Sequence, residues 1–162
     1  MTRAEFQEVV DRVPNELYIG GRWRAASSSG TFAVHDPGTE EPLAEVADGQ
    51  ADDAAAALDA AAGAQEQWAA TPARERGEIL RRAWQLMTDR ADDLALVMTL
   101  EMGKSLTESQ AEVAYAAEFF RWFSEEAVRI HGRFSRSPAK SHERMVTMKR
   151  PVGPCLLITP WS

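Results

Sequence analysis

The 162-residue sequence has one cysteine, no long hydrophobic run and fewer basic than acidic residues. Cys155 has no partner for an internal disulfide, which favours a reducing, cytoplasmic location. No stretch reaches the ~20 apolar residues that cross a bilayer, and residues 1–13 lack the core of a signal peptide, so we expect no membrane association. Lysine and arginine total 18 against 25 acidic residues, and the net charge of −7 argues against nucleic-acid binding.

Glycine-rich phosphate loops and metal-ligand spacings are missing too. Neither G-x-G-x-x-G nor G-x-x-x-x-G-K-[ST] occurs, and Gly103-Lys104-Ser105 lacks the earlier glycine of a phosphate loop. The three histidines have no H-x-x-x-H spacing and no cysteine pair beside them, so we expect no metal site. Cys155 lies between Pro154 and an apolar run, which favours a buried core residue over a reactive thiolate.

The first third of the chain has β-strand patterns. After an N-terminal segment, residues 1–15, Gly20-Gly21 joins two β-prone runs and predicts a hairpin, because glycine takes positive φ at both turn positions. Further β-prone runs near 31–34 and 43–47 complete the pattern. Together they predict a small β-meander.

Residues 48–132 have helical patterns. The alanine-rich run 51–70 predicts one helix, and Thr71-Pro72 predicts the start of a second, in which Thr71 is the cap. We expect a break near 88–93 and then a third helix that ends before Gly103, a residue favoured just past helix ends.

The fourth predicted helix has the clearest start signal. Ser105 and Glu108 have the spacing of a capping box, and the helix that they open runs to about His131. Its apolar residues cover an arc of about 200°, beyond the ~100° stripe of an ordinary surface helix. We therefore expect neighbours to cover this helix on more than one side.

The last thirty residues predict two strands. Residues 133–143 are polar and suggest an extended connection, whereas residues 145–148 alternate as a strand does. The run 155–159 is continuously apolar, which is typical of a buried parallel strand. A parallel strand needs neighbours and crossovers, so we expect the chain to be the front part of a larger α/β domain.

Six short motifs occur in a set order along the chain. They are Leu17-Tyr18-Ile19-Gly20-Gly21-Arg22-Trp23, Asp36-Pro37, Leu100-Glu101-Met102-Gly103-Lys104-Ser105-Leu106, Glu112-Val113-Ala114-Tyr115, Phe119-Phe120-Arg121-Trp122-Phe123, and Lys149-Arg150-Pro151-Val152-Gly153-Pro154-Cys155-Leu156-Leu157-Ile158-Thr159-Pro160-Trp161. In this order they resemble the amino-terminal part of the aldehyde dehydrogenase superfamily. In detail they are most similar to bacterial succinate-semialdehyde dehydrogenases.

The resemblance implies a truncated α/β fold: a β-meander, a helical layer and the start of a parallel sheet. Residues 16–132 would be the N-terminal part of the NAD(P)-binding domain. Residues 133–151 would be an oligomerisation-arm strand with its connection, and residues 152–162 the first core strand, cut off. Members of this family assemble into homo-oligomers, so the parent enzyme is expected to be a dimer or a tetramer.

The resemblance also implies oxidation of an aldehyde, in particular succinic semialdehyde, to the carboxylic acid with NAD or NADP. In the family a cysteine thiolate attacks the aldehyde and a glutamate later activates water. Cys155 does not match that nucleophile, and the matching cysteine and glutamate lie beyond Ser162. We therefore expect the isolated chain to be inactive.

The resemblance assigns a few site residues to this chain. Four of them match the strand end beside the cofactor: Ile158, Thr159, Pro160 and Trp161. Ser162 falls where the family has its oxyanion-binding asparagine, and its side chain is shorter. Tyr115 and Phe119 are candidates for the aldehyde tunnel, with core packing as the competing interpretation.

Two other functional classes stay open from the sequence. The helical layer is also consistent with a non-catalytic interaction or scaffold protein that binds a partner. A self-sufficient nucleotide-binding module is the third class, but it has no glycine loop to support it.

Overall fold

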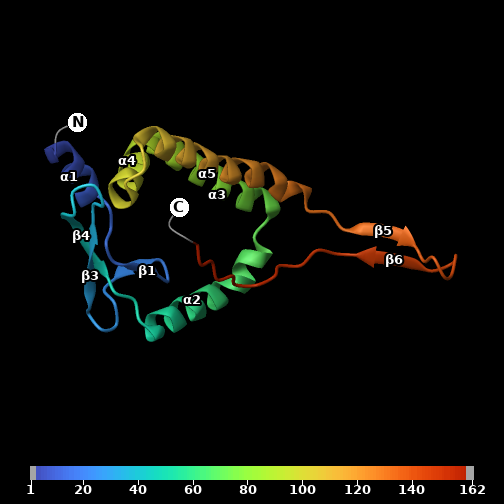
Figure 1. The fold of residues 1–162 in the computed structure, drawn as a ribbon. Coiled ribbons are helices and arrows are strands. Elements are labelled where there is room, and N and C mark those ends of the chain that lie inside the picture. The colour runs from blue at the N-terminus through green and yellow to red at the C-terminus, as the bar shows by residue number, and fades with distance from the viewer. Residues whose placement is uncertain (1–2, 160–162) are drawn as a thin grey trace.

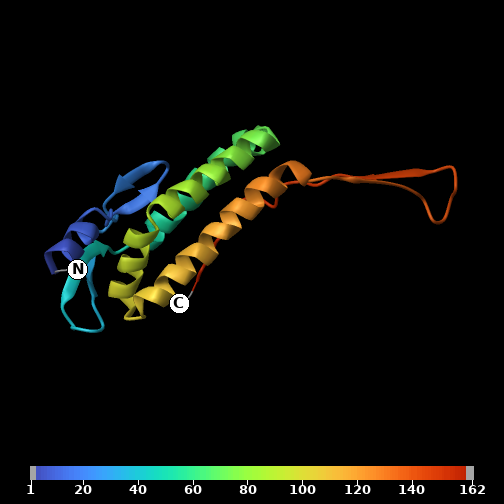
Figure 2. The ribbon, with the colours of Figure 1, turned by 90° about the horizontal axis from the view of Figure 1, so that it is seen from above.

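The structure, a computed structural model, describes residues 3–159 (Figure 1). Its elements, in chain order, are α1 (Arg3–Asp11), β1 (Leu17–Ile19), β2 (Arg22–Arg24), β3 (Thr31–His35), β4 (Pro42–Ala47), α2 (Ala51–Ala70), α3 (Ala73–Asp89), α4 (Ala91–Met102), α5 (Leu106–Glu126), a 3₁₀ turn (Ala127–Arg129), β5 (Arg133–Arg136) and β6 (Arg144–Thr147). Helices α3 and α5 lie side by side, and α4 packs at one end of them, next to α1 (Figures 1 and 2). The β5–β6 hairpin projects away from the helices (Figure 2).

The predicted Gly20-Gly21 hairpin is confirmed. Both glycines have positive φ, 61° and 79°, and β1 pairs antiparallel with β2 around them. The predicted meander is wrong, because β3 and β4 form a second two-stranded sheet that is not joined to the first. The chain leaves β2 through a turn in which Ser29 N donates to the Ala26 carbonyl, so the ladder does not continue into β3.

The four predicted helices are present, with two changes at their ends. Gly103 ends α4 with a φ of 76°, and the break between α3 and α4 falls at Arg90. Thr71 does not cap α3; its hydroxyl donates to the Gln67 carbonyl at 2.9 Å and finishes α2 instead. Helix α5 ends at Glu126, earlier than His131, because the chain tightens into the 3₁₀ turn.

Small residues make up the contact between α3 and α5. A Cβ built on Gly77 of α3 would lie 2.7 Å from the carbonyl oxygen of Ser124 in α5, so the two backbones approach closely only because position 77 has no side chain. Val113 and Ala117 of α5 are buried, and the hydroxyls of Thr99 and Ser109 share a hydrogen bond of 2.9 Å between α4 and α5. These contacts hold α5 in one orientation.

Asp53 joins the first hairpin to the start of α2. Its carboxylate is 2 % exposed and accepts hydrogen bonds from the backbone N–H and hydroxyl of Ser27, the backbone N–H of Gln50 and the guanidinium of Arg24. These donors, the backbone N–H of Ser27 first, hold the pKa of Asp53 well below its usual range. The carboxylate therefore acts as a charged link between two segments that are about 26 residues apart.

Replacing Asp53 by asparagine is expected to lower the thermal midpoint of the chain by roughly 5–10 °C at neutral pH, because buried N–H groups lose a charged acceptor. The pKa is lower in the folded state, so the unfolded chain binds more protons as the pH falls below about 5. The stabilisation is complete above the unfolded pKa of about 3.9 and is lost as the pH falls towards the folded value. Thermal unfolding followed by circular dichroism from pH 7 to pH 2 measures both effects.

Asp52 gives the matched control, because it lies in the same helical turn and is exposed. Asp52→Asn should change the midpoint little and leave its dependence on pH intact. An equal loss in both variants would show that the helix dipole, and not the buried hydrogen bonds of Asp53, provides the stabilisation.

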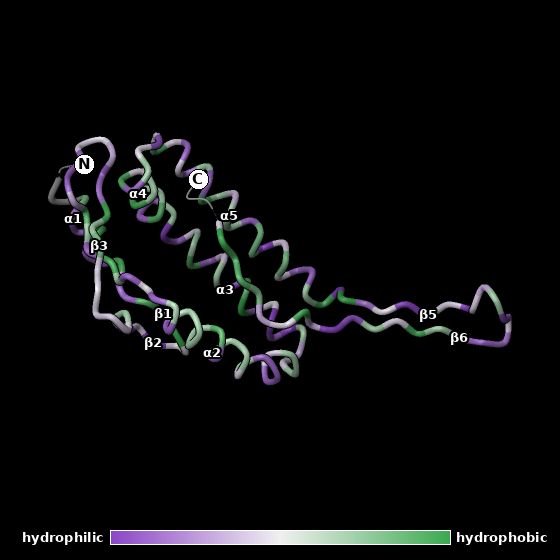
Figure 3. The backbone as a smooth tube through the Cα atoms, turned by 60° about the horizontal axis from the view of Figure 1, so that its bottom comes forward, coloured by the Kyte–Doolittle hydropathy of each residue, from purple (hydrophilic) through white to green (hydrophobic). Residues whose placement is uncertain are grey.

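The part of the chain after α5 differs most from expectation. The polar connection 133–143 contains a strand, β5, that pairs antiparallel with β6 into a hairpin. The predicted buried strand at 155–159 does not form: Leu156, Leu157 and Ile158 are 81–86 % exposed, and Cys155 is exposed instead of buried. The reason is that no other described strand lies beside this hydrophobic stretch, which Figure 3 shows in green before the C-terminal end.

The chain exposes 12433 Å² of surface. A compact monomer of this size exposes about 8,000 Å². The large apolar side chains on the surface lie mainly on α5, on the hairpin and in the last described residues. The elements therefore form in this chain while much of their apolar surface stays uncovered.

Candidate functional site

The first candidate site is an exposed row of aromatic side chains on α5, here called the aromatic face: Tyr115, Phe119, Trp122 and Phe123. Their spacing of three and four residues places them on one side of the helix. Tyr115 and Phe119 meet edge to face with ring centroids 5.0 Å apart. Together with Glu118 these residues line a shallow, mostly apolar hollow.

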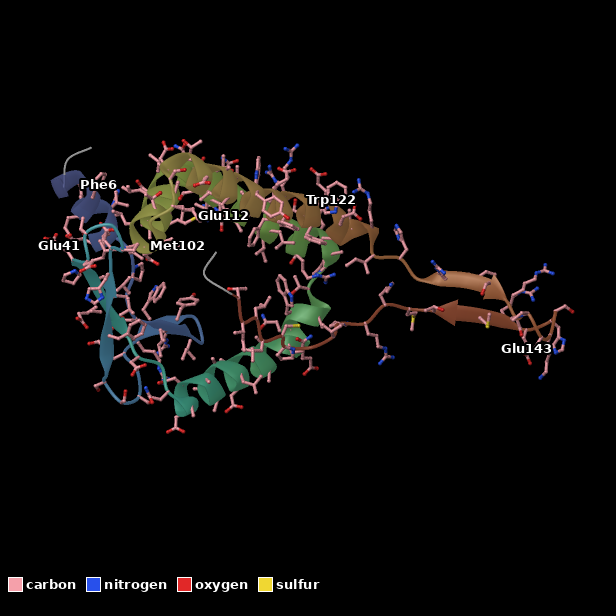
Figure 4. The ribbon with its side chains drawn as sticks, viewed as in Figure 1. Phe6, Glu41, Met102, Glu112, Trp122 and Glu143 are labelled. Atoms are coloured by element: carbon pink, nitrogen blue, oxygen red, sulfur yellow. The ribbon has the colours of Figure 1, made fainter. Side chains whose placement is uncertain are left out.

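The rest of α5 anchors this face. Glu112 and Trp122 lie towards opposite ends of the helix (Figure 4). Lys104 forms an ion pair with Glu112 near the start of the helix, and the guanidinium of Arg121 lies 5.6 Å from the ring centre of Trp84 in α3. Because α5 is fixed on α3 and α4, the aromatic face has a defined direction. The sequence predicts that neighbours cover this helix on more than one side, but the described residues leave the aromatic face uncovered. Tyr115, for example, is 68 % exposed.

The second candidate site is the C-terminal segment. Ile158 and Thr159 are exposed, and Ile158 is 86 % exposed. Gly153 turns the chain with a φ of 98°, and the thiol of Cys155 donates to the Gly153 carbonyl at 3.5 Å. Pro160, Trp161 and Ser162 lie outside the described residues.

The structure does not bring the two candidate sites into one pocket. Among residues 3–159 no hydrogen bond or ring contact connects Ile158 or Thr159 with Tyr115 or Phe119. Each candidate site is one side of a potential pocket, and residues 3–159 do not form the opposite side of either one.

Two carboxyl groups near the α4–α5 connection have shifted pKa values. Burial raises the pKa of Glu101, which lines a mostly apolar groove between α1, β4 and α4. Hydrogen bonds from the Ser105 hydroxyl and backbone N–H lower the pKa of Glu108, as a capping box requires. The Glu101 groove is lined otherwise by apolar and amide side chains, so it has a protonatable group but no nucleophile.

Within residues 3–159 no group of three histidine, cysteine, aspartate or glutamate side chains is placed to hold a metal ion. Over the same residues, no helix combines the length and the apolar character needed to span a bilayer.

Comparison with known proteins identifies the family. The model of the aldehyde dehydrogenase family matches residues 23–162. The chain belongs to the aldehyde dehydrogenase family. Among curated relatives, the succinate-semialdehyde dehydrogenase of Paenarthrobacter nicotinovorans is 56 % identical over 120 residues, 74 % of this chain and 26 % of the relative. The Schizosaccharomyces pombe enzyme named succinate-semialdehyde dehydrogenase [NADP(+)] 1 is 42 % identical over 153 residues, 94 % of this chain and 30 % of the relative.

Solved aldehyde dehydrogenase structures share the fold. The succinate-semialdehyde dehydrogenase of Burkholderia pseudomallei superposes with a TM-score of 0.86 at 45 % identity, covering 91 % of this chain and 30 % of that one. The betaine aldehyde dehydrogenase of Staphylococcus aureus, in complex with NAD+, has a TM-score of 0.80 at 28 % identity, with coverage of 83 % and 27 %. The chain thus spans less than a third of these relatives and corresponds to their N-terminal part.

Sequence reasoning missed one important residue of this N-terminal part of the fold. Asp53, to which the sequence analysis gives no role, is the buried acceptor that holds Ser27 and Arg24. Its position three residues after Gln50 was the available signal, because that spacing places an acidic side chain over the free N–H at a helix start.

Proposed function

We propose that this chain forms the N-terminal part of an NAD(P)-dependent dehydrogenase that oxidises an aldehyde, in particular succinic semialdehyde, to its carboxylic acid. The observation that carries the proposal is the match to succinate-semialdehyde dehydrogenases in sequence and in fold over nine-tenths of the chain. Relatives named for NADP(+) and solved with NAD+ support either nucleotide.

The described residues do not fit a dinucleotide on their own. Ile158 and Thr159 are exposed, and no other described strand faces them. In the proposal, Ile158, Thr159, Pro160 and Trp161 form one wall beside the nucleotide once neighbouring strands are present. Ser162 takes the position of the oxyanion-binding residue.

The aromatic face supports a role in the complete domain. A row of four aromatic side chains, fixed on a well-packed helix and exposed to water, is typical of a surface that packs against another element. In the proposal the face packs against the sheet of the complete domain. Tyr115 and Phe119, at its N-terminal end, border the path of the aldehyde.

The β5–β6 hairpin supports assembly of subunits into a dimer or a tetramer. Every residue of both strands is exposed, including the cross-strand pair Phe134 and Val146. On the same face Arg136 lies opposite Arg144, and like charges in this position destabilise a hairpin. A two-stranded hairpin is marginal alone in water, so we propose that this arm packs on another subunit. Glu143 lies at its tip (Figure 4).

A chimera tests the proposal. Residues 1–162 replace the matching segment of the Burkholderia pseudomallei enzyme, and reduced nucleotide is followed by absorbance with succinic semialdehyde and NAD+ or NADP+. We expect turnover from the chimera and an oligomeric mass by light scattering. We expect no turnover from the 162-residue chain alone, because none of its residues matches the family's nucleophilic cysteine.

The parent Burkholderia enzyme and its variant lacking the nucleophilic cysteine serve as positive and negative controls. A folded, oligomeric chimera that is inactive towards succinic semialdehyde but active towards other aldehydes would contradict the substrate. Turnover by the 162-residue chain alone would contradict the proposed division of the active site.

A further inference from the structure

The chain after β6 passes the C-terminal end of α2 (Figure 1). A second hollow is lined by residues of these two segments. It has a volume of about 340 Å³ and is lined by Trp68, Ala69, Arg76, Ile130, Lys149, Arg150 and Pro151. The hollow combines residues from the end of α2, the start of α3 and the two segments that flank the hairpin. It shares no lining residue with the hollow on the aromatic face or with residues 155–159.

The charge of this hollow is of one sign. Arg76, Lys149 and Arg150 line it, and none of its lining residues is acidic. None of the three cations forms an ion pair with a carboxylate of residues 3–159, whereas Arg24, Lys104 and Arg129 do. In a chain with 25 acidic and 18 basic residues, three neighbouring unpaired cations make a local positive field in an otherwise negative molecule.

One of the cations is held in place. Arg76 is half-buried, and its Nη1 donates to the backbone carbonyl of Thr71, which ends α2. This bond uses one N–H of the guanidinium and restricts the side chain, and the other donors stay available. A pre-oriented guanidinium loses less side-chain entropy when it binds an anion, and it matches the two oxygens of a carboxylate or phosphate.

The remaining lining is apolar. Trp68 is 43 % exposed and Ile130 is 60 % exposed, and Pro151 completes this surface. The hollow therefore offers cationic donors together with a hydrophobic surface of a few side chains. A single small ion such as chloride would contact only the cationic donors. An anion with a short carbon or phosphate body would contact both the donors and the hydrophobic surface.

We propose that this hollow binds a small anion with at least two negative charges, a dicarboxylate or a phosphate compound. In this proposal the three cations bind the charged groups of the anion, and the exposed ring of Trp68 contacts its body. The inference is independent of the proposed dehydrogenase activity, because the hollow is formed by the described chain alone.

Fluorescence titration of the 162-residue chain tests the site. Succinate and pyrophosphate are the two probes, each added at constant ionic strength with sodium chloride as the balance, and tryptophan emission is recorded. We expect a saturable change with at least one probe, and the probe that saturates identifies the dicarboxylate or the phosphate as the ligand class. The change should disappear in Trp68→Phe, which assigns it to the hollow among five tryptophans.

The double variant Lys149→Gln/Arg150→Gln should weaken binding at least about tenfold, because two charged donors are lost from exposed positions that make no ion pair in the described chain. Arg22→Gln/Arg136→Gln removes the same charge from the β1–β2 and β5–β6 hairpins and should leave the affinity unchanged. Circular dichroism verifies that every variant is folded. A linear response equal to that of sodium chloride, an equal loss in the control pair, or a signal that survives Trp68→Phe overturns the site.

Discussion

Replacing Ser162 by asparagine in the chimera is expected to raise kcat about 100-fold, with little change in KM. In the proposed function, position 162 is the oxyanion-binding residue, and one donor of this type contributes roughly 10²–10³ in kcat. The serine hydroxyl lies one bond closer to the backbone than the asparagine amide nitrogen. We therefore expect that the hydroxyl does not reach the oxygen that gains charge in the transition state.

Ser162→Ala tests whether the serine hydroxyl contributes to kcat. If the hydroxyl contributes nothing, alanine and serine should give the same kcat, while asparagine alone restores the rate. Equal rates for serine and asparagine would mean that the hydroxyl already donates to the oxyanion. A change in KM without a change in kcat would assign position 162 to substrate binding instead.

Replacing Gly77 by alanine is expected to destabilise the chain by about 1–3 kcal/mol, the usual cost of forcing an extra methyl group into a packed contact. The sign is informative, because alanine normally stabilises a helix interior by roughly 0.5–1 kcal/mol relative to glycine. Here the added Cβ would lie 2.7 Å from the carbonyl oxygen of Ser124, and a backbone atom of α5 must move to accept it. Urea unfolding followed by circular dichroism measures the change.

Gly63 provides the matched control inside α2. A Cβ at this position meets nothing within 4 Å, so Gly63→Ala should stabilise the chain by roughly 0.5–1 kcal/mol. Two glycine-to-alanine changes in helix interiors should thus have opposite signs. A stabilising effect at both positions would show that α3 and α5 do not approach each other as closely as the structure indicates.

Signals that act over a few residues were the predictable part of the fold. Gly20-Gly21 gave the first hairpin, Ser105 and Glu108 gave the start of α5, and Gly103 gave the end of α4. Each depends on a backbone conformation or a cap that neighbouring residues decide, so each is present in the sequence itself.

Contacts between distant segments could not be predicted in the same way. The Asp53 carboxylate binds residues 26 and 29 positions earlier, and nothing near Asp53 reports that partnership. Strand β5 exists because β6 pairs with it, although the intervening sequence is polar. The run 155–159 has the composition of a buried strand, but burial depends on neighbours that the described chain does not supply.

Candidate site residues come only from the family resemblance, and their roles stay predictions. Composition alone favours a buried Cys155 and gives no role to Ile158 or Thr159, whereas the ordered motifs predict that the last two lie beside a nucleotide. The hollow around Trp68 has no motif, because its cations come from positions 76, 149 and 150 and meet only in the fold.

The order of the helices along the chain has a consequence for biosynthesis. Helices α3, α4 and α5 follow one another directly and pack on each other, so this bundle has mostly local contacts and can form early on the ribosome. Its aromatic face then stays uncovered in the nascent polypeptide, where chaperones and neighbouring chains on the same messenger RNA can bind it. In the proposed complete domain, the rate at which the partner surface is synthesised sets how long this face stays uncovered.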